Sequence, residues 1–417
     1  MNNPLTNAQA GKAKTVIATE TVVPEAAQDK VDYSVSGGLL ALLSKQNVSI
    51  AFTSYQSGLL YMVGRTAQGG VNIHQTAMPK PMGLCLEASG GLCMTAGYQI
   101  MRLENVLEAG QAVNGIFDAC YVPRTVHVTG RLDAHDVGID TEGRVIFVNT
   151  RFNCLATTSQ RHSFEVVWTP PFISGVVDED RCHLNGLAME NGRPRYVTAV
   201  SRSDTIDGWR DRRHDGGVVV DVETNEIVCT GLSMPHSPRV HNGELWLLNS
   251  GTGELGKVVF EKANGKSKAK TAGRFEPVVF CPGFLRGLRI VGNLAFVGLS
   301  KPRYKRFEGL ALDQKLKDAD TDPWCGIQVI DLSKKTCVEW FRLDGSIGEL
   351  YDVELLPDVS LPMAVPPVSE EAANLITYEG LVATPAEPRS AALNADAKTN
   401  SDTYTPEAQG ALAASKT

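Results

Sequence analysis

Short apolar runs alternate with turn-forming residues through most of the chain. Between the two ends, runs rich in Val, Ile, Leu, Phe and Ala are separated by Gly, Pro, Asn and Asp, as expected of β-strands joined by tight turns. Helical periodicity is nearly absent, and only residues 102–109 and 310–320 are candidates for helices. The pattern therefore predicts an all-β domain.

Two sequence tracts recur along this domain. In the first, a polar or bulky residue precedes Gly, Asp or Ser and an apolar run; the copies are centred on Met82, His135, Asn185, His236, Arg286 and Tyr351. Successive copies are separated by 53, 50, 51, 50 and 65 residues. A second tract, an apolar run that ends in polar residues, follows each of the first five copies after about ten residues. A period of about 50 residues is typical of four-stranded propeller blades.

The tracts at the two ends of the domain each lack a partner. Residues 48–55 form a second-type tract with no first-type tract before it, whereas the Tyr351 copy has no second-type tract after it. A closed ring requires this arrangement, with a C-terminal strand as the innermost strand of the first blade. We predict a six-bladed β-propeller over residues 38–360, closed by pairing of a strand near 350–357 with the first blade. The remaining segments, 1–37 and 361–417, have the composition of disordered tails.

The repeats bring polar side chains to one end of the central channel. In a propeller the innermost strands begin at that end, and the turns between the second and third strands lie on the same face. The strand starts contribute Met82, His135, Asn185, His236, Arg286, Tyr351 and Asp352, with His183 close by, and the turns contribute Asn149, Arg151, Arg202 and Lys301. We expect these side chains to surround a pocket.

Two of the turns are much longer than the others and face the same pocket. They span residues 201–216 and 301–324, each resumes into a matching strand, and together they are expected to form a lid. The basic residues that they carry are Arg202, Arg210, Arg212, Arg213, Lys301, Arg303, Lys305 and Arg306. A locally basic rim favours a small anionic ligand such as a carboxylate or phosphate. The alternative is a solvated turn whose charges pair with Asp204, Asp207, Asp211 and Asp215.

Three histidines of neighbouring blades have three alternative roles. His135, His183 and His236 either hydrogen-bond to neighbouring blades, bind a metal ion, or act as general acid or base with Asp352 or Glu349 as the acidic partner. No H-x-H or H-E-x-x-H spacing supports a metal site, and an arginine in the same ring would repel a cation. We therefore expect no metal and no other cofactor.

Charge and composition exclude other classes of protein. The 417 residues carry 40 Lys and Arg against 47 Asp and Glu, so the net charge of -7 gives no reason to expect nucleic acid or an anionic membrane as a partner. No stretch has the roughly 20 apolar residues of a membrane helix, and the start lacks a signal peptide. The nine cysteines form no C-x-x-C pair. These features predict a cytoplasmic protein with reduced thiols.

Several long strings resemble a known family. They are DRCHLNGLA at 180–188, GLSMPHSPR at 231–239, LNSGTGEL at 248–255, GFLRGL at 283–288 and GLSKPR at 298–303. They are similar to a bacterial family of conserved proteins of unknown function, sometimes fused to tetratricopeptide repeats. The resemblance covers about residues 38–360, implies a propeller-like domain, and supplies no known reaction.

Three hypotheses of function follow. In the first, the top of the channel binds a small anion, which Arg286, Arg202 and Lys301 clamp and which Asn185 and Asn149 orient. Further contacts to the anion come from Arg151, Tyr351 and Asp352. The acid/base catalyst is one of three histidines: His135, His183 or His236. In the second, the propeller is a scaffold for a protein partner, with an exposed patch that includes Trp209, Tyr304 and Phe307. The third is a metal-dependent hydrolase.

Overall fold

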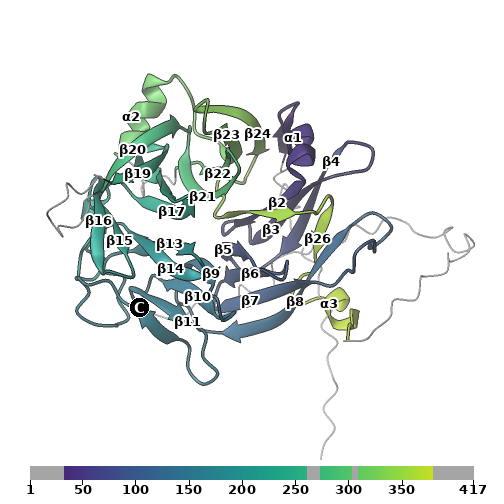
Figure 1. Cartoon of the computed structure of the whole chain (residues 1–417), viewed down its shortest axis with the longest axis horizontal. Helices are drawn as coiled ribbons and strands as arrows, with labels where there is room; N and C mark the ends of the chain where they lie inside the picture. The colour runs from purple at the N-terminus through teal and green to yellow at the C-terminus, as the bar shows by residue number, and fades with distance from the viewer. Residues whose placement is uncertain (1–31, 261–272, 303–308, 379–417) are drawn as a thin grey trace, which may run out of the picture. The chain divides into compact units, whose positions relative to one another are not determined.

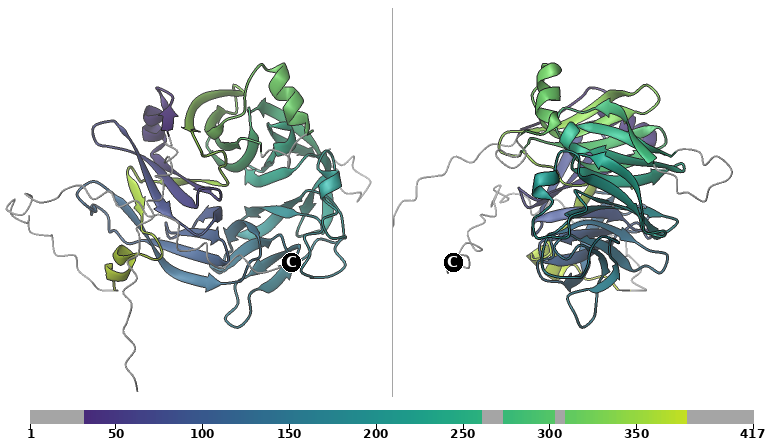
Figure 2. Two further views of the ribbon diagram at one scale, coloured as in Figure 1. Left: turned by 180° about the vertical axis from the view of Figure 1, so that it is seen from behind. Right: turned by 90° about the vertical axis from the view of Figure 1, so that its left-hand side faces the viewer.

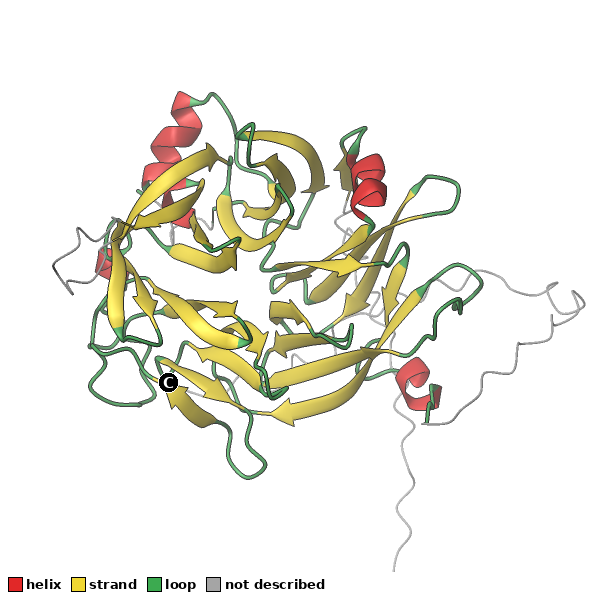
Figure 3. Ribbon diagram, in the orientation of Figure 1, coloured by secondary structure: helices red, strands yellow, loops and turns green. Residues whose placement is uncertain are grey.

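The computed structural model describes residues 32–260, 273–302 and 309–378. The chain forms two compact units, and the boundary between them follows Asn374. Up to that residue the chain is a ring of six sheets, antiparallel with one exception, around a central channel, and the α-helices lie outside the ring (Figures 1 and 3). This confirms the predicted six-bladed β-propeller. Within the described residues, no helix is both long enough and apolar enough to cross a membrane.

The first three blades run outward from the channel in strand order. The first comprises β25 (Val353–Pro357), β2 (Val48–Ser54), β3 (Leu59–Arg65) and β4 (Val71–Ala77). The second comprises β5 (Pro81–Leu86), β6 (Leu92–Ala96), β7 (Gln99–Asn105), β8 (Ala119–Val128) and β26 (Pro362–Ala364). The third comprises β9 (Ala134–Ile139), β10 (Val145–Asn149), β11 (Cys154–Thr157) and β12 (Glu165–Trp168).

The other three blades follow the same order. The fourth comprises β13 (Leu184–Glu190), β14 (Arg193–Ala199), β15 (Gly217–Asp221) and β16 (Glu226–Leu232). The fifth comprises β17 (Pro235–His241), β18 (Glu244–Asn249), β19 (Glu254–Phe260) and β20 (Gly273–Phe280). The sixth comprises β21 (Phe284–Val291), β22 (Leu294–Ser300), β23 (Cys325–Asp331), β24 (Thr336–Asp344) and β1 (Asp32–Val35).

The ring closes as predicted, through a strand from late in the chain. β25 pairs antiparallel with β2, with Ile50 opposite Leu355, and it supplies the innermost strand of the first blade (Figure 2). The predicted tails, however, reach too far into the domain: the N-terminal tail was expected to end later than it does, and the C-terminal tail to begin earlier. β1 pairs with β24 of the sixth blade, and β26 pairs parallel with β8 of the second blade. Both strands are too short for their periodicity to be visible in the sequence. Residues 1–31 and 379–417 of the predicted tails lie outside the described residues.

The helix predictions have mixed outcomes. α2 (Ala311–Asp318) confirms the candidate at 310–320. The candidate at 102–109 is wrong, because β7 continues to Asn105 and pairs with β8. The sequence pattern missed α1 (Leu39–Gln46), whose Leu39 and Leu43 are buried against the first and sixth blades. The remaining short helices are η1 (Arg210–Arg212), η2 (Ser250–Thr252) and α3 (Glu370–Asn374).

Hydroxyl groups at the ends of the second strands connect neighbouring blades. Each donates a hydrogen bond to a backbone carbonyl at the start of the next inner strand. The pairs are Thr53 with Met82 (2.5 Å), Thr95 with Ala134 (2.7 Å), Thr150 with Leu184 (2.6 Å), Ser250 with Leu285 (2.6 Å) and Ser300 with Leu350 (2.9 Å). These polar tips of the second tract therefore hold the ring together instead of facing the pocket.

At one position, the inner strands alternate between glycine and a polar residue from blade to blade. The residue after each first-tract centre is a polar residue in one blade and glycine in the next, in the order Gly83, Asp136, Gly186, Ser237, Gly287 and Asp352. Each polar side chain accepts a hydrogen bond from a backbone N–H of the following blade, at 2.9 to 3.0 Å. The glycines permit this close approach: a Cβ at Gly83 would lie 2.8 Å from the Cα of Asp136.

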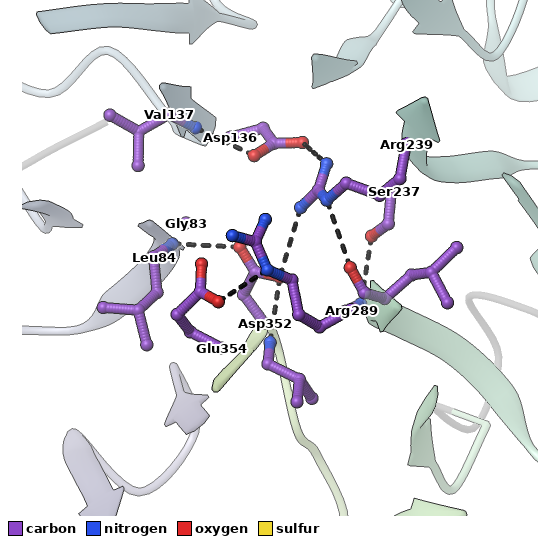
Figure 4. A network of polar contacts seen from close by, with 12 residues as sticks. Gly83, Leu84, Asp136, Val137, Ser237, Arg239, Arg289, Asp352 and Glu354 are labelled. Carbon is purple, nitrogen blue, oxygen red and sulfur yellow. Dashed lines mark hydrogen bonds and ion pairs between the residues drawn. The ribbon is translucent and has the colours of Figure 1, made fainter. Parts of the chain in front are cut away.

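A buried arginine lies at the centre of this arrangement (Figure 4). Arg239 donates hydrogen bonds to Asp136 at 3.1 Å and to the carbonyl groups of Leu187 and Leu288, and it lies 3.6 Å from Asp352. Burial opposes its charge, but the two carboxylates raise the pKa of the guanidinium above its ordinary value. Conversely, burial raises the pKa of Asp352 to about 7 despite the opposing effect of Arg239. This polar network ties five blades together across the channel.

Candidate functional site

A cavity of about 450 Å³ lies at the end of the channel where the inner strands begin. The predicted residues that line it are Met82, His135, His183, Arg286 and Tyr351, and the first long turn adds Trp209, Arg210, Asp211 and Arg213. Asp133, Asp180, Met234 and Tyr55 complete the lining. The expectation that strand starts and one long turn meet in a polar pocket therefore agrees with the structure.

His135 is held in one tautomer at the cavity wall. Its Nδ1 lies 2.7 Å from the carbonyl oxygen of Asp133, which can only accept a hydrogen bond, so Nδ1 carries the proton. Asp133 has a positive φ of 53°, which turns this carbonyl toward the ring. Burial lowers the pKa of His135 to about 4, against the opposing effect of Asp133. His135 is therefore neutral at pH 7, and no described residue donates a hydrogen bond to the lone pair of its Nε2.

His236, two blades away, has the same hydrogen bond from Nδ1 to a backbone carbonyl, but its Nε2 contacts a neighbouring blade. Its Nδ1 donates to the carbonyl of Met234 at 2.8 Å, and its Nε2 lies 3.3 Å from the amide nitrogen of Asn185. Asn185 in turn accepts a hydrogen bond from Thr198. Burial and the neighbouring Arg286 hold the pKa of His236 well below its ordinary value. His236 and Asn185 thus hydrogen-bond to each other and are not among the described residues that line the cavity, so the structure does not bring them to the site where they were expected.

His183 forms a pair with a carboxylate that the sequence analysis missed. Its Nδ1 lies 2.7 Å from Asp180, which also accepts a hydrogen bond from the His183 backbone N–H. Burial alone would raise the pKa of Asp180, but the interaction with His183 keeps it below its ordinary value. The spacing of three residues within one loop was the available signal. Asp352 and Glu349, the acidic partners expected from the sequence, bind other described residues: Asp352 accepts hydrogen bonds from Leu84 and Val353, and Glu349 from Ser54 and Gln56.

Aromatic rings fix the position of the His183 ring. It stacks on Trp209 with ring centroids 4.1 Å apart, and it meets His135 edge to face at 4.9 Å. Trp209 is only 6% exposed, so it belongs to the cavity wall and not to an exposed patch. The other members of that predicted patch, Tyr304 and Phe307, lie outside the described residues. The feature expected of a protein-binding scaffold is therefore absent at Trp209.

Arg286 is a buried cation with few partners. Its side chain is 8% exposed, and its nearest carboxylate oxygen, on Glu349, is 4.0 Å away. The guanidinium lies over the ring of Tyr351 at 4.8 Å. Its Nε has no hydrogen-bond partner among the described residues, and neither does the Tyr351 hydroxyl. Buried polar groups are nearly always hydrogen-bonded, so two such donors side by side in one cavity wall call for an acceptor.

The two long turns pack against each other. Trp209 of the first turn shares an apolar cluster with Leu310, Leu312 and Leu316 of the second, together with Met234 and Phe284. That the two turns act as a lid stays a prediction. Arg303, Lys305 and Arg306 of the second turn lie outside the described residues.

The remaining predicted ligand-binding residues do not line the cavity. Arg202 is exposed, Lys301 binds through its backbone to Gly348, and Arg151 pairs with Asp178 on the surface. The Asn149 side chain accepts a hydrogen bond from the backbone of Phe152, and Asp352 belongs to the Arg239 network. Arg210 lines the cavity, but it also forms an ion pair with Asp207 at 2.9 Å. Such a pair is expected under the alternative in which acidic residues of the turn neutralise its basic ones. Side-chain direction, which the repeat does not encode, decides these outcomes.

The part of the chain that the structure describes holds no group of three His, Cys, Asp or Glu side chains placed to bind a metal ion. The two cavity histidines have Nδ1 atoms committed to an aspartate carboxylate and a carbonyl. The structure therefore offers no ligand set for the metal-dependent hydrolase hypothesis.

Fold and site together define a six-bladed β-propeller with a buried arginine and two oriented histidines at one mouth of its channel. The chain belongs to the family described as Domain of unknown function (DUF4915), which matches residues 37–365. This confirms the resemblance to a family of unknown function seen in the sequence. No curated protein matches the chain.

Several solved structures have a similar fold at low sequence identity. A nidogen/laminin complex has a TM-score of 0.43 at 10% identity, covering 75% of this chain and 99% of that chain. A streptogramin B lyase has a TM-score of 0.35 at 12% identity, covering 71% and 76%. Virginiamycin B lyase from Staphylococcus aureus has a TM-score of 0.36 at 10% identity, covering 75% and 99%. Function has to be argued from the cavity itself.

Proposed function

We propose that the propeller binds a small anion in the channel-mouth cavity, with Arg286 as the central contact. The observation that carries this proposal is the buried Arg286 guanidinium, whose Nε has no hydrogen-bond partner among the described residues. A buried cation without hydrogen bonds is costly, and an anion in the cavity would supply the missing acceptors. Glu349, at 4.0 Å, offsets part of the charge but is too distant for a hydrogen bond.

The neighbouring histidines are suited to this arrangement. Because burial lowers the pKa of His135 and His236, neither ring adds a positive charge that would repel Arg286 at neutral pH. Tyr351 contributes a second unpartnered donor, since burial keeps the pKa of its hydroxyl well above the ordinary value and the group stays protonated. An arginine and a phenol side by side form a typical recognition pair for a carboxylate or phosphate.

The proposal assigns acid/base chemistry to His183. Asp180 holds its Nδ1 at 2.7 Å, and Trp209 fixes the ring plane, so Nε2 is the atom available to a bound molecule. A carboxylate on Nδ1 holds the tautomer in which Nε2 carries the lone pair, as a general base requires. If the bound anion is converted, His183→Asn should abolish turnover while binding changes less than about threefold. Unchanged turnover in this variant would remove His183 from the chemistry.

Anion binding is tested by thermal stabilisation. The purified protein is screened against carboxylates and phosphates, beside an Arg286→Met variant and an Arg202→Met control that removes an exposed arginine of the same rim. We expect stabilisation in the wild type and the control and its loss in Arg286→Met. Stabilisation that survives in Arg286→Met would show that the anion binds elsewhere.

A further inference from the structure

We propose that the anion is a hydroxylated monocarboxylate, a molecule that presents one carboxylate together with neighbouring hydroxyl groups. This inference rests on the proposed anion site at Arg286 and specifies which anion it recognises. Its basis is an inventory of the donors and acceptors that the cavity wall leaves without partners.

The donors without acceptors lie on different sides of the cavity, so one carboxylate is not placed to reach all of them. The described residues leave Arg286 Nε and the Tyr351 hydroxyl without acceptors, and Trp209 Nε1 interacts with Asp180 but makes no hydrogen bond of ordinary geometry. Each of the three residues lines the cavity with less than a tenth of its surface exposed. They come from the sixth blade, the segment before β25 and the first long turn, so they surround the cavity from different sides. A carboxylate at Arg286 and Tyr351 leaves Trp209 to a further oxygen of the same molecule.

The wall also presents an acceptor, which a carboxylate alone cannot use. His135 is neutral because burial lowers the pKa of its ring, and its Nδ1 proton is already donated to Asp133. Its Nε2 lone pair therefore requires a donor, and an ionised carboxylate has none. A hydroxyl group both donates and accepts, so it can serve His135 and Trp209 where a second carboxylate could serve only one.

The charges around the cavity disfavour a ligand with two negative charges. The lining carries Arg210, Arg213 and Arg286 against Asp133, Asp180 and Asp211, and Glu349 lies behind Arg286. No surplus of positive charge is left for a second negative charge, whereas a phosphate ester carries close to two at neutral pH. The charge balance therefore selects a carboxylate over a phosphate. A volume of about 450 Å³ is within the usual range for small-ligand pockets.

The experiment compares matched probes by calorimetry. Glycerate, threonate, xylonate and gluconate are each titrated beside the plain fatty acid of equal carbon number and the corresponding polyol, with glucose 6-phosphate as the dianion. We expect at least one hydroxylated carboxylate to bind tenfold or more tighter than its plain acid, its polyol and glucose 6-phosphate. Equal affinity for plain and hydroxylated acids, or a preference for the phosphate, would overturn the inference while leaving anion binding intact. If none of the anions binds, the proposed function fails as well.

Two tyrosine variants test the same point within the protein. Tyr351→Phe removes only the unpartnered hydroxyl, and we expect it to weaken binding of the best hydroxylated carboxylate about tenfold. Tyr61→Phe is the matched control, because Tyr61 is equally buried but hydrogen-bonds to Ser57 away from the cavity, and it should bind like the wild type. His135→Asn should lower the preference for hydroxylated over plain acids, because the amide can replace the Nδ1 donor but not the Nε2 acceptor. An unchanged preference in both site variants would contradict the assignment.

Discussion

The buried Arg239 network offers a sharp test of how the ring is held together. Arg239→Met keeps most of the aliphatic volume of the side chain and removes the guanidinium. Asp136 and Asp352, both less than 5% exposed, then lose their countercharge. The carbonyl groups of Leu187 and Leu288 lose their arginine donor at the same time.

The expected loss of stability follows from these contacts. Removing one partner of a buried ion pair typically costs about 3–5 kcal/mol, because the other charge stays buried without compensation. Each carbonyl left without its donor adds roughly 1 kcal/mol. The pKa of Asp352 should rise further in the variant, since Arg239 lowers it more than the backbone N–H groups of Leu84 and Val353 do. Protonation of Asp352 limits the total, so we expect a loss of about 3–5 kcal/mol at pH 7.5.

Urea unfolding of a short series of variants measures this loss. Arg239→Met is compared with Asp136→Asn and with the double variant, and Arg144→Met removes an exposed arginine as a control. The double variant should lose clearly less than the sum of the single variants, because the residues share one interaction. A loss below about 1 kcal/mol in Arg239→Met, or strict additivity, would refute the reasoning.

Further predictions concern pH and close packing. The pKa of His135 falls from 6.5 to about 4 on folding, so its contribution to stability is complete above pH 6.5 and disappears as the pH falls to 4. His135→Asn should therefore flatten the acid side of the stability profile measured by urea unfolding; an unchanged slope would contradict this. A Cβ at Gly287 would lie 2.6 Å from the backbone nitrogen of Val353 at a φ of 76°, so Gly287→Ala should lower the melting temperature strongly. Gly292→Ala, at a φ of 55° with open space around it, should lower it only slightly, and equal losses would show that contact with the closing strand is unimportant.

The fold was predictable because its signals are local and repeated. Each blade shows the same order of apolar runs and turns, and the two unpaired tracts predicted the pairing of β25 with β2. The missed elements lack that repetition. β1 and β26 are short edge strands that depend on pairing with distant segments, and α1 is an eight-residue helix that ends at Asn47 in the left-handed conformation.

The candidate site was predictable only as a location. The repeat placed Arg286, His135 and Tyr351 at one mouth of the channel, and these side chains do line the cavity. It could not show that Asn185 and His236 hydrogen-bond to each other, because a repeat assigns the same position to both residues in neighbouring blades. Bulges in the inner hairpins, such as the register shift between His236 and Arg239, redirect individual side chains. A periodic pattern carries no record of such irregularities.

The central claim is that Arg286 binds an anion at the mouth of the channel. The most direct measurement is a crystal structure of the protein with the tightest-binding carboxylate of the calorimetric series. The account predicts carboxylate oxygens within hydrogen-bond distance of the Arg286 guanidinium and the Tyr351 hydroxyl. A ligand bound elsewhere, with the contact between Arg286 and Glu349 unchanged, would contradict it.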